Sequence, residues 1–195
     1  MSNDSEELRF INNLSVLVAM GRPLRETLAN MRKACQIEAL LPAYDAMIET
    51  LDKGGDFTTV LGDYPQLCSR SSQALLGAAR RSSCLAIVLP KLARLIHARV
   101  DGELDPRQRF LETWALLVEC GFSTEAALGE LTHDFAHGPL GEVAEGLRAA
   151  AQGGRRLASA AERFPEAFDA MSIDLLAYGE ARDLPNALRA ITRLI

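Results

Sequence analysis

The sequence contains no apolar run long enough to cross a membrane, and cysteine is scarce. The longest uninterrupted apolar stretch, CLAIVLP at 84–90, is far short of the roughly 20 residues that a membrane-spanning helix needs. The first ten residues, MSNDSEELRF, lack the basic segment and apolar core of a signal peptide. Four cysteines occur, none in a CxxC pair, which favours small buried thiols in a reducing compartment over disulfides. We therefore expect a soluble cytoplasmic protein.

The chain also lacks an excess of basic residues. Its 21 Lys and Arg residues and 26 Asp and Glu residues give a net charge of −5. A nucleic-acid-binding protein usually presents a basic face, so this composition argues against nucleic acid as a partner. The length of 195 residues suits one ordinary domain or two small domains of roughly 100 residues each.

Alternating runs of Val, Ile, Thr and Tyr, which are typical of half-buried strands, are missing as well. Instead, apolar residues form stripes at i, i+4, i+7 and i+8, as on one face of a helix. The stripe in residues 10–18 returns 100 positions later, in residues 110–118. The two stripes are Phe10, Leu14, Leu17 and Val18, and Phe110, Trp114, Leu117 and Val118. The chain is therefore predicted to be all-α.

The residues that end helices recur in the same order as the stripes. Gly21 and Gly121 follow the stripes, where a left-handed residue ends a helix, and Ser123 is suited to cap the next helix. Double glycines at 54–55 and 153–154 and aromatic–proline steps at 64–65 and 164–165 follow. Segment 41–55 is thereby aligned with segment 140–154, and an indel of one residue separates the short segments that follow them. Such ordered recurrence indicates an internal duplication. We predict two domains of about six helices each, residues 1–98 and 109–195, joined by a polar linker.

No catalytic motif is evident. His133 and His137 have the i, i+4 spacing of zinc ligands on a helix, but no glutamate adjoins His133 and no third ligand is obvious. The double glycines are not followed by the GK[ST] of a phosphate loop, and no serine or cysteine lies in a nucleophile motif. We therefore expect no enzyme and no cofactor. A metal-dependent enzyme built around His133, His137 and Glu180 is the least favoured alternative.

Three phrases of the second copy carry a family resemblance: FLETWALLVECGFSTEAALGEL, GGRRLASAAERFPEAF and YGEARDLPNALRAI. They resemble the cytoplasmic domain of the type II secretion system F protein and its type IV pilus relatives, the inner-membrane platform proteins. The matching residues of the second copy are Phe110, Leu117, Gly121, Leu128, Gly154, Leu157, Phe164, Pro165, Phe168, Gly179, Glu180 and Leu184. Those of the first copy match more loosely: Phe10, Leu14, Leu17, Gly21, Pro23, Leu24, Leu28, Gly55, Pro65 and Gly77.

The resemblance implies a six-helix bundle used twice and a non-catalytic platform that couples an assembly ATPase to a growing pseudopilus or pilus and dimerises. Some domains of the family hold a metal through acidic residues near the Gly-Glu motif, which here would be Glu180 and Asp183. In the first copy Ala78 stands where this alignment expects the glutamate. Platform proteins place membrane helices after each domain. We therefore expect either a soluble relative with two fused domains, which we favour, or a derivative from which those spans were removed.

From the resemblance we predict a scaffold or adaptor of a type II secretion or type IV pilus machine. Its expected partners are the assembly ATPase, inner-membrane components and a second copy of the chain, with no direct membrane insertion. We expect it in the cytoplasm, attached peripherally to the inner membrane through these partners. The alternative is a generic α-helical protein-binding module unrelated to secretion.

Overall fold

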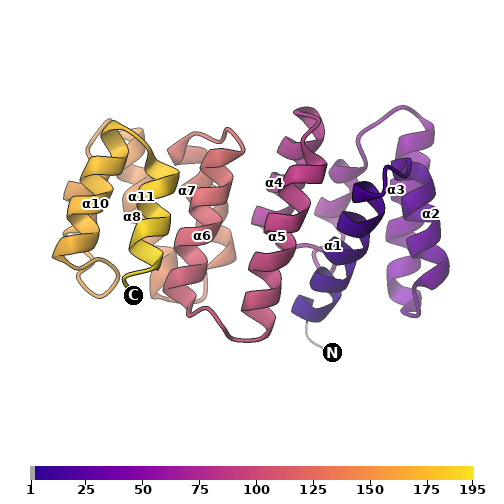
Figure 1. Cartoon of the computed structure of the whole chain (residues 1–195), viewed down its shortest axis with the longest axis horizontal. Coiled ribbons are helices and arrows are strands. Elements are labelled where there is room, and N and C mark those ends of the chain that lie inside the picture. Colours follow the sequence, from indigo (N-terminus) through magenta and orange to yellow (C-terminus); the bar gives the residue numbers. More distant parts are fainter. Residues whose placement is uncertain (1–2) are drawn as a thin grey trace. The chain divides into compact units, whose positions relative to one another are not determined.

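A computed structural model describes residues 3–195, in which the regular elements are helices and no strand occurs (Figure 1). The chain divides into two compact units, Met1–Asp101 and Gly102–Ile195, here called unit 1 and unit 2. Met1 and Ser2, where the first predicted domain begins, lie outside the described residues. The prediction of an all-α, duplicated fold is confirmed.

The two units contain the same succession of helices, except that unit 1 has the additional short helix η1. Unit 1 consists of α1 (Asn3–Ala19), α2 (Leu24–Ala34), the short 3-10 helix η1 (Glu38–Leu40), α3 (Leu41–Asp52), the 3-10 helix η2 (Phe57–Asp63), α4 (Arg70–Arg81) and α5 (Leu85–Val100). Unit 2 consists of α6 (Pro106–Glu119), α7 (Thr124–Asp134), α8 (Pro139–Gln152), α9 (Leu157–Ala161), α10 (Ala170–Ala181) and α11 (Leu184–Thr192). Helix η2 of unit 1 takes the place of α9 in unit 2.

Each unit begins with the predicted helix–glycine–helix hairpin. Gly21 has a φ of +72° and Gly121 a φ of +90°, a region that side chains disfavour, so glycine is needed to end α1 and α6. Ser123 caps α7, because its hydroxyl accepts a hydrogen bond from the Ala126 N–H at 3.2 Å. The aromatic–proline steps form turns, in which the carbonyls of Tyr64 and Phe164 accept from residues 67 and 167.

The predicted stripes form the cores of the two units. Phe10, Leu14, Phe110, Trp114 and Leu117 are fully buried. The large aromatic partner of the first phenylalanine comes from different helices in the two units. Tyr44 on α3 lies 6.2 Å from Phe10, whereas Trp114 on α6 lies 6.0 Å from Phe110. Tyr44 is replaced by Ala144, 100 positions later, and Trp114 replaces Leu14, so the bulk lost on α8 is regained on α6.

The predicted alignment of segment 41–55 with segment 140–154 is wrong by one residue. Gly54 and Gly154 both have positive φ, +76° and +62°, and both donate their N–H to the carbonyl three residues earlier, at Leu51 and Ala151. The offset between the copies is therefore 100 here as well, and the counterpart of Gly55 is Arg155. A one-residue change occurs only later, because α5 begins four residues after the end of α4 and α11 begins three residues after the end of α10.

Gly55 has a separate role. A Cβ atom there would lie 2.8 Å from the Thr50 Cγ2, so the missing side chain allows the chain to turn back over the end of α3. It therefore serves close packing and not the left-handed helix stop, which belongs to Gly54.

Candidate functional site

The Gly-Glu motif lies at the end of α10, where that helix contacts α11. A Cβ atom on Gly179 would lie 2.4 Å from the Ala187 Cβ and 3.3 Å from the Leu184 Cα. The glycine therefore lets α11 pack directly on α10. Ala79 takes the same position in unit 1 and is fully buried.

Glu180 caps a helix that lies far from it in sequence. Its carboxylate accepts hydrogen bonds from the backbone N–H groups of Leu157 and Ala158, the latter at 3.2 Å. These groups begin α9, whose N-cap residue, Arg156, has no capping side chain. A helix N-terminus carries unsatisfied N–H groups and partial positive charge, so a carboxylate stabilises it. Glu180 thereby ties α10 to α9.

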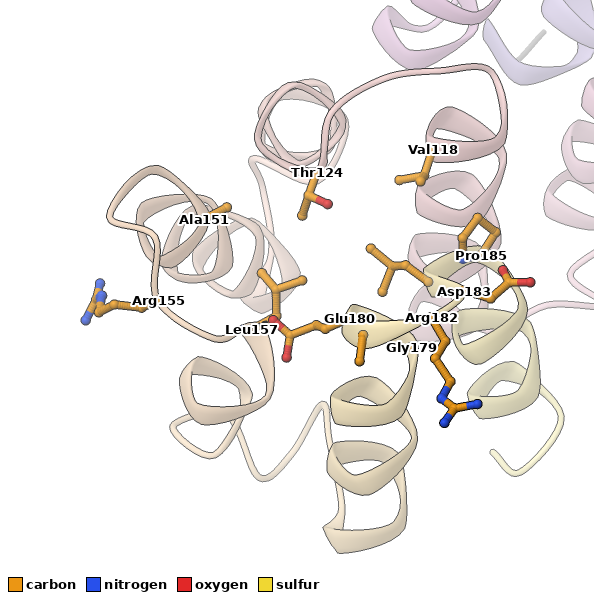
Figure 2. A pocket seen from close by; sticks show the side chains of 12 residues that line it. Val118, Thr124, Ala151, Arg155, Leu157, Gly179, Glu180, Arg182, Asp183 and Pro185 are labelled. Atoms are coloured by element: carbon orange, nitrogen blue, oxygen red, sulfur yellow. Dashed lines mark hydrogen bonds between the residues drawn. The ribbon is translucent and has the colours of Figure 1, made fainter.

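Asp183 has the equivalent role at the start of α11. Its Oδ1 accepts from the Asn186 N–H at 3.1 Å, and its Oδ2 accepts from the Asn186 Nδ2 at 2.6 Å. Figure 2 shows that the Glu180 carboxylate points towards Leu157, whereas that of Asp183 points away from it, beside Pro185. In the described part of the chain no three His, Cys, Asp or Glu residues form a group suited to hold a metal ion. A metal site at Glu180 and Asp183 stays a prediction, and these hydrogen bonds compete with it.

The two acidic residues line a pocket of about 550 Å³ in unit 2. Val118, Leu157 and Leu184 supply its apolar surface, and Arg155 and Arg182 are charged residues of its lining. The Arg182 guanidinium lies over the Tyr178 ring, 5.1 Å from its centroid, and in Figure 2 both arginines extend away from the hollow. The pocket is thus an apolar hollow with a charged border, and its carboxylates are committed to helix ends.

Unit 1 has charges of the opposite sign at the two equivalent positions. Counted from the N-caps Ser69 and Asp169, the counterpart of Glu180 is Arg80, not Ala78 as the sequence comparison predicted. The carboxylate that caps η2 is instead Asp56, which accepts from the Thr58 N–H at 3.0 Å. Asp56 is in turn the counterpart of Arg156. At these two positions unit 1 therefore has the acidic residue first, Asp56 and then Arg80. Unit 2 has the basic residue first, Arg156 and then Glu180.

His133 and His137 do not lie on one helix face. Helix α7 ends at Asp134, so His133 lies in its last turn and His137 in the turn that follows. The i, i+4 spacing gives a shared face only within a continuous helix. The structure thus removes the geometric basis of the proposed zinc pair.

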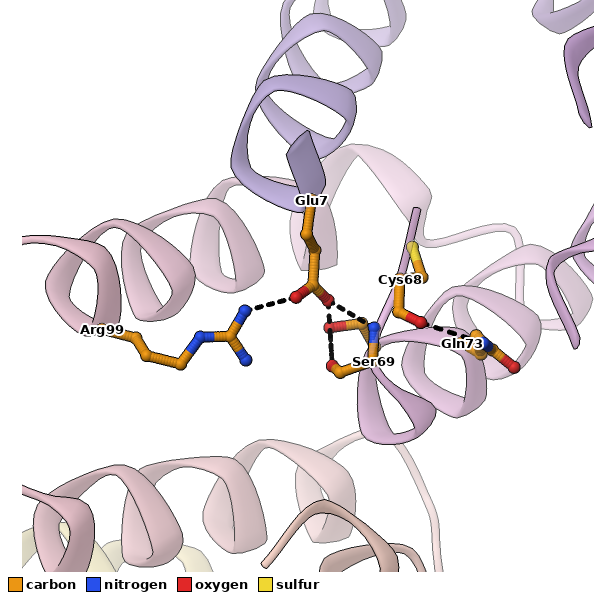
Figure 3. Close-up of polar contacts among 6 residues, drawn as sticks. Glu7, Cys68, Ser69, Gln73 and Arg99 are labelled. Carbon is orange, nitrogen blue, oxygen red and sulfur yellow. Dashed lines mark hydrogen bonds and ion pairs between the residues drawn. The ribbon is translucent and has the colours of Figure 1, made fainter. Parts of the chain in front are cut away.

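The polar cluster around Glu7 was not predicted from the sequence. Glu7 on α1 is 3% exposed, and its Oε1 accepts from the Ser69 N–H at 2.8 Å and the Ser69 hydroxyl at 2.9 Å (Figure 3). Its Oε2 accepts from the Arg99 guanidinium near the end of α5. Glu7 lies on the apolar face of α1, three residues before Phe10. A charged residue at such a position is the sequence feature that could have indicated a buried polar cluster. The cluster joins α1, the N-terminus of α4 and α5.

A side-chain contact between α2 and α3, here called a bridge, recurs in unit 2 between α7 and α8 with different residues. Arg25 donates from Nη2 to the Asp52 Oδ2 at 3.1 Å, and this pairing lowers the pKa of the Asp52 carboxyl. At the same positions in unit 2, Gln152 donates from Nε2 to the Glu125 Oε1 at 2.9 Å. The bridge between the helices is retained while the acidic residue moves to the other helix.

The comparison with known families agrees with these observations. The family described as type II secretion system (T2SS), protein F, matches residues 10–109 and again residues 110–195. No curated protein matches the chain. The family comprises non-catalytic platform proteins associated with the inner membrane. Within residues 3–195, no helix has the length and apolar character needed to span a bilayer. Two matched segments cover nearly the whole chain, and the protein therefore belongs to the type II secretion system protein F family, with two of its domains in tandem and an implied place in a secretion machine.

Proposed function

We propose that this protein is a non-catalytic scaffold or adaptor of a type II secretion or type IV pilus machine. The observation that carries the proposal is the family match over both units. The assembly ATPase and inner-membrane components are the proposed partners, and residues 1–98 and 109–195 are the proposed binding domains. We place the protein in the cytoplasm, held at the inner membrane through these partners.

Exposed apolar side chains on helix surfaces support protein binding. Met171 and Tyr178, seven residues apart on α10, are each 59% exposed and share one face of that helix. Such residues are enriched in the cores of protein–protein interfaces.

The test is capture of the tagged full chain from its native host, followed by identification of bound proteins. We expect an assembly ATPase or an inner-membrane secretion component, and defective secretion or piliation in a deletion strain. The double variant Met171→Asp/Tyr178→Asp should lose part of the capture, while Asp174→Asn, an exposed change on the same helix, should not. Normal secretion and pili in the deletion strain, with no machine component captured, would favour the generic protein-binding module.

A homodimer is also proposed from family membership. Light scattering of the purified chain at high concentration should give twice the monomer mass. A monomer mass at every concentration would contradict it. Metal analysis of the same preparation tests the remaining alternative, since a metal-dependent enzyme requires a stoichiometric metal.

A further inference from the structure

Helices α1 and α5 run antiparallel, and the Glu7–Arg99 contact sets their register. Both helices rise about 1.5 Å per residue, so each step forward on α1 corresponds to one step back on α5. Met20 therefore lies level with residues 86 and 87, and Val16 with residues 90 and 91. Figure 1 shows the two helices side by side in unit 1.

This register places three large exposed apolar residues on neighbouring turns of the two helices. Val16 is 59% exposed, Met20 67% and Ile87 65%. Smaller apolar residues between them are also exposed: Ala19, Ala86 and Pro90. We call these six residues the α1–α5 face. A large exposed apolar patch on a protein surface is a feature of contact surfaces, and these six residues are our candidate for one.

In unit 2 the corresponding surface carries ion pairs between α6 and α11. Arg189 on α11 pairs with Glu119 and, at 3.7 Å, with Glu112, both on α6. The counterparts of these three residues in unit 1 are Pro90, Ala19 and Asn12, so unit 1 has no ion pair there. Leu116, the counterpart of Val16, is only 4% exposed. The exposed apolar surface is therefore specific to unit 1.

The charged residues of α5 and of the segment before it have one sign. From residue 64 to residue 100 the sequence contains six Lys and Arg residues and no Asp or Glu. Arg94 follows Ile87 at i+7, so it shares the face of α5 that carries Ile87, and it is exposed. Arg22, just after α1, is exposed as well. The apolar residues thus lie among cations.

We propose that the α1–α5 face binds directly to an anionic phospholipid surface. Aliphatic side chains that enter the headgroup region, bordered by Lys and Arg that meet acidic headgroups, are the features of a peripheral membrane contact. In this proposal α1 and α5 lie on the membrane surface and do not cross the bilayer. The proposed contact is made by unit 1 alone.

The test is co-sedimentation of the full chain with phosphatidylglycerol vesicles and with phosphatidylcholine vesicles. We expect binding to the first at low salt, weaker binding to the second, and loss of binding as salt is raised. Met20→Asp/Ile87→Asp should lower the vesicle affinity about tenfold or more, because it replaces inserted apolar groups by like charges. Arg94→Glu should lower it about fivefold or more.

Two controls separate this proposal from misfolding and from the proposed function. Met171→Asp/Tyr178→Asp makes the same kind of exposed change in unit 2 and should bind vesicles like the wild type. Circular dichroism should show the same unfolding curve for all variants. No binding to phosphatidylglycerol, or an equal loss in both double variants, overturns the proposal. So does a wild-type dimer that Met20→Asp/Ile87→Asp dissociates, since a second copy would then cover the face. Vesicle binding needs no secretion partner, so either proposal can fail alone.

Discussion

The role of Glu180 as a helix cap can be tested by removing its carboxylate. In Glu180→Ala the N–H groups of Leu157 and Ala158 lose their acceptors, and both residues are nearly buried. An unsatisfied buried donor costs about 1–3 kcal/mol, so the expected loss in the free energy of unfolding of unit 2 is about 2–4 kcal/mol. Asp56→Ala, which removes the local cap of η2, should cost unit 1 only about 1 kcal/mol.

The assay uses the single tryptophan of the chain. Trp114 is fully buried in unit 2, so its fluorescence reports the urea unfolding of that unit. The midpoint should fall in Glu180→Ala without a change in slope. The second variant, Glu180→Ala/Arg156→Asp, places a local cap where unit 1 has Asp56. It should recover about 1 kcal/mol of the loss.

Three results would refute this reasoning. One is a loss below about 0.5 kcal/mol in Glu180→Ala, the range of surface substitutions without a structural role. Another is the absence of any recovery on adding Arg156→Asp. The third is stabilisation of the wild type by calcium that Glu180→Ala abolishes, because Glu180 would then be a metal ligand.

Further expectations concern other parts of the structure. Glu7→Ala should destabilise unit 1 by about 3 kcal/mol, because it leaves the Arg99 charge without its carboxylate. In a double-mutant cycle monitored by circular dichroism, Glu7→Ala/Arg99→Ala should cost less than the sum of the two single changes. Burial raises the pKa of Tyr44 to about 12 from its usual 10.0, so the stability linked to the neutral phenol is intact below pH 10 and lost as the pH rises towards 12. Tyr44→Phe should remove this loss from urea midpoints measured across that range; an unchanged alkaline profile would contradict it. Gly121→Ala should lower the free energy of unfolding of unit 2 by about 1–2 kcal/mol, because its φ of +90° strains a side chain. The tryptophan-detected urea midpoint should fall accordingly; an unchanged midpoint would argue against this strain.

The helices and their stops could be predicted from the sequence because both are local properties. A stripe such as that of Phe110 and Leu117 needs only helical periodicity, and Gly121 needs only the conformation of one residue. The order of these signals also revealed the duplication. Family phrases pointed to the Gly179–Glu180 pair, which the structure places at a junction of three helices.

The polar connections could not be predicted, because their partners are far apart in the sequence. Glu7 meets Ser69 across 62 residues and Arg99 across 92, and neither spacing leaves a periodic trace. The comparison of the copies failed where glycines were aligned with each other. Gly77 matches Gly179 in type, yet the caps and helix bounds align Ala79 with Gly179. Hydrogen bonds, and not residue identity, define the register.

The reversed charges in the two units bear on how a chain with two similar halves folds. Neighbouring domains of one fold risk exchanging equivalent helices during folding. If α7 replaced α2 beside α3, Glu125 would meet Asp52, and if α1 replaced α6, Glu7 would approach Asp169. Like charges at such positions repel, whereas each helix finds a complementary partner in its own half. The altered bridges therefore disfavour the exchange of these helices between the two units.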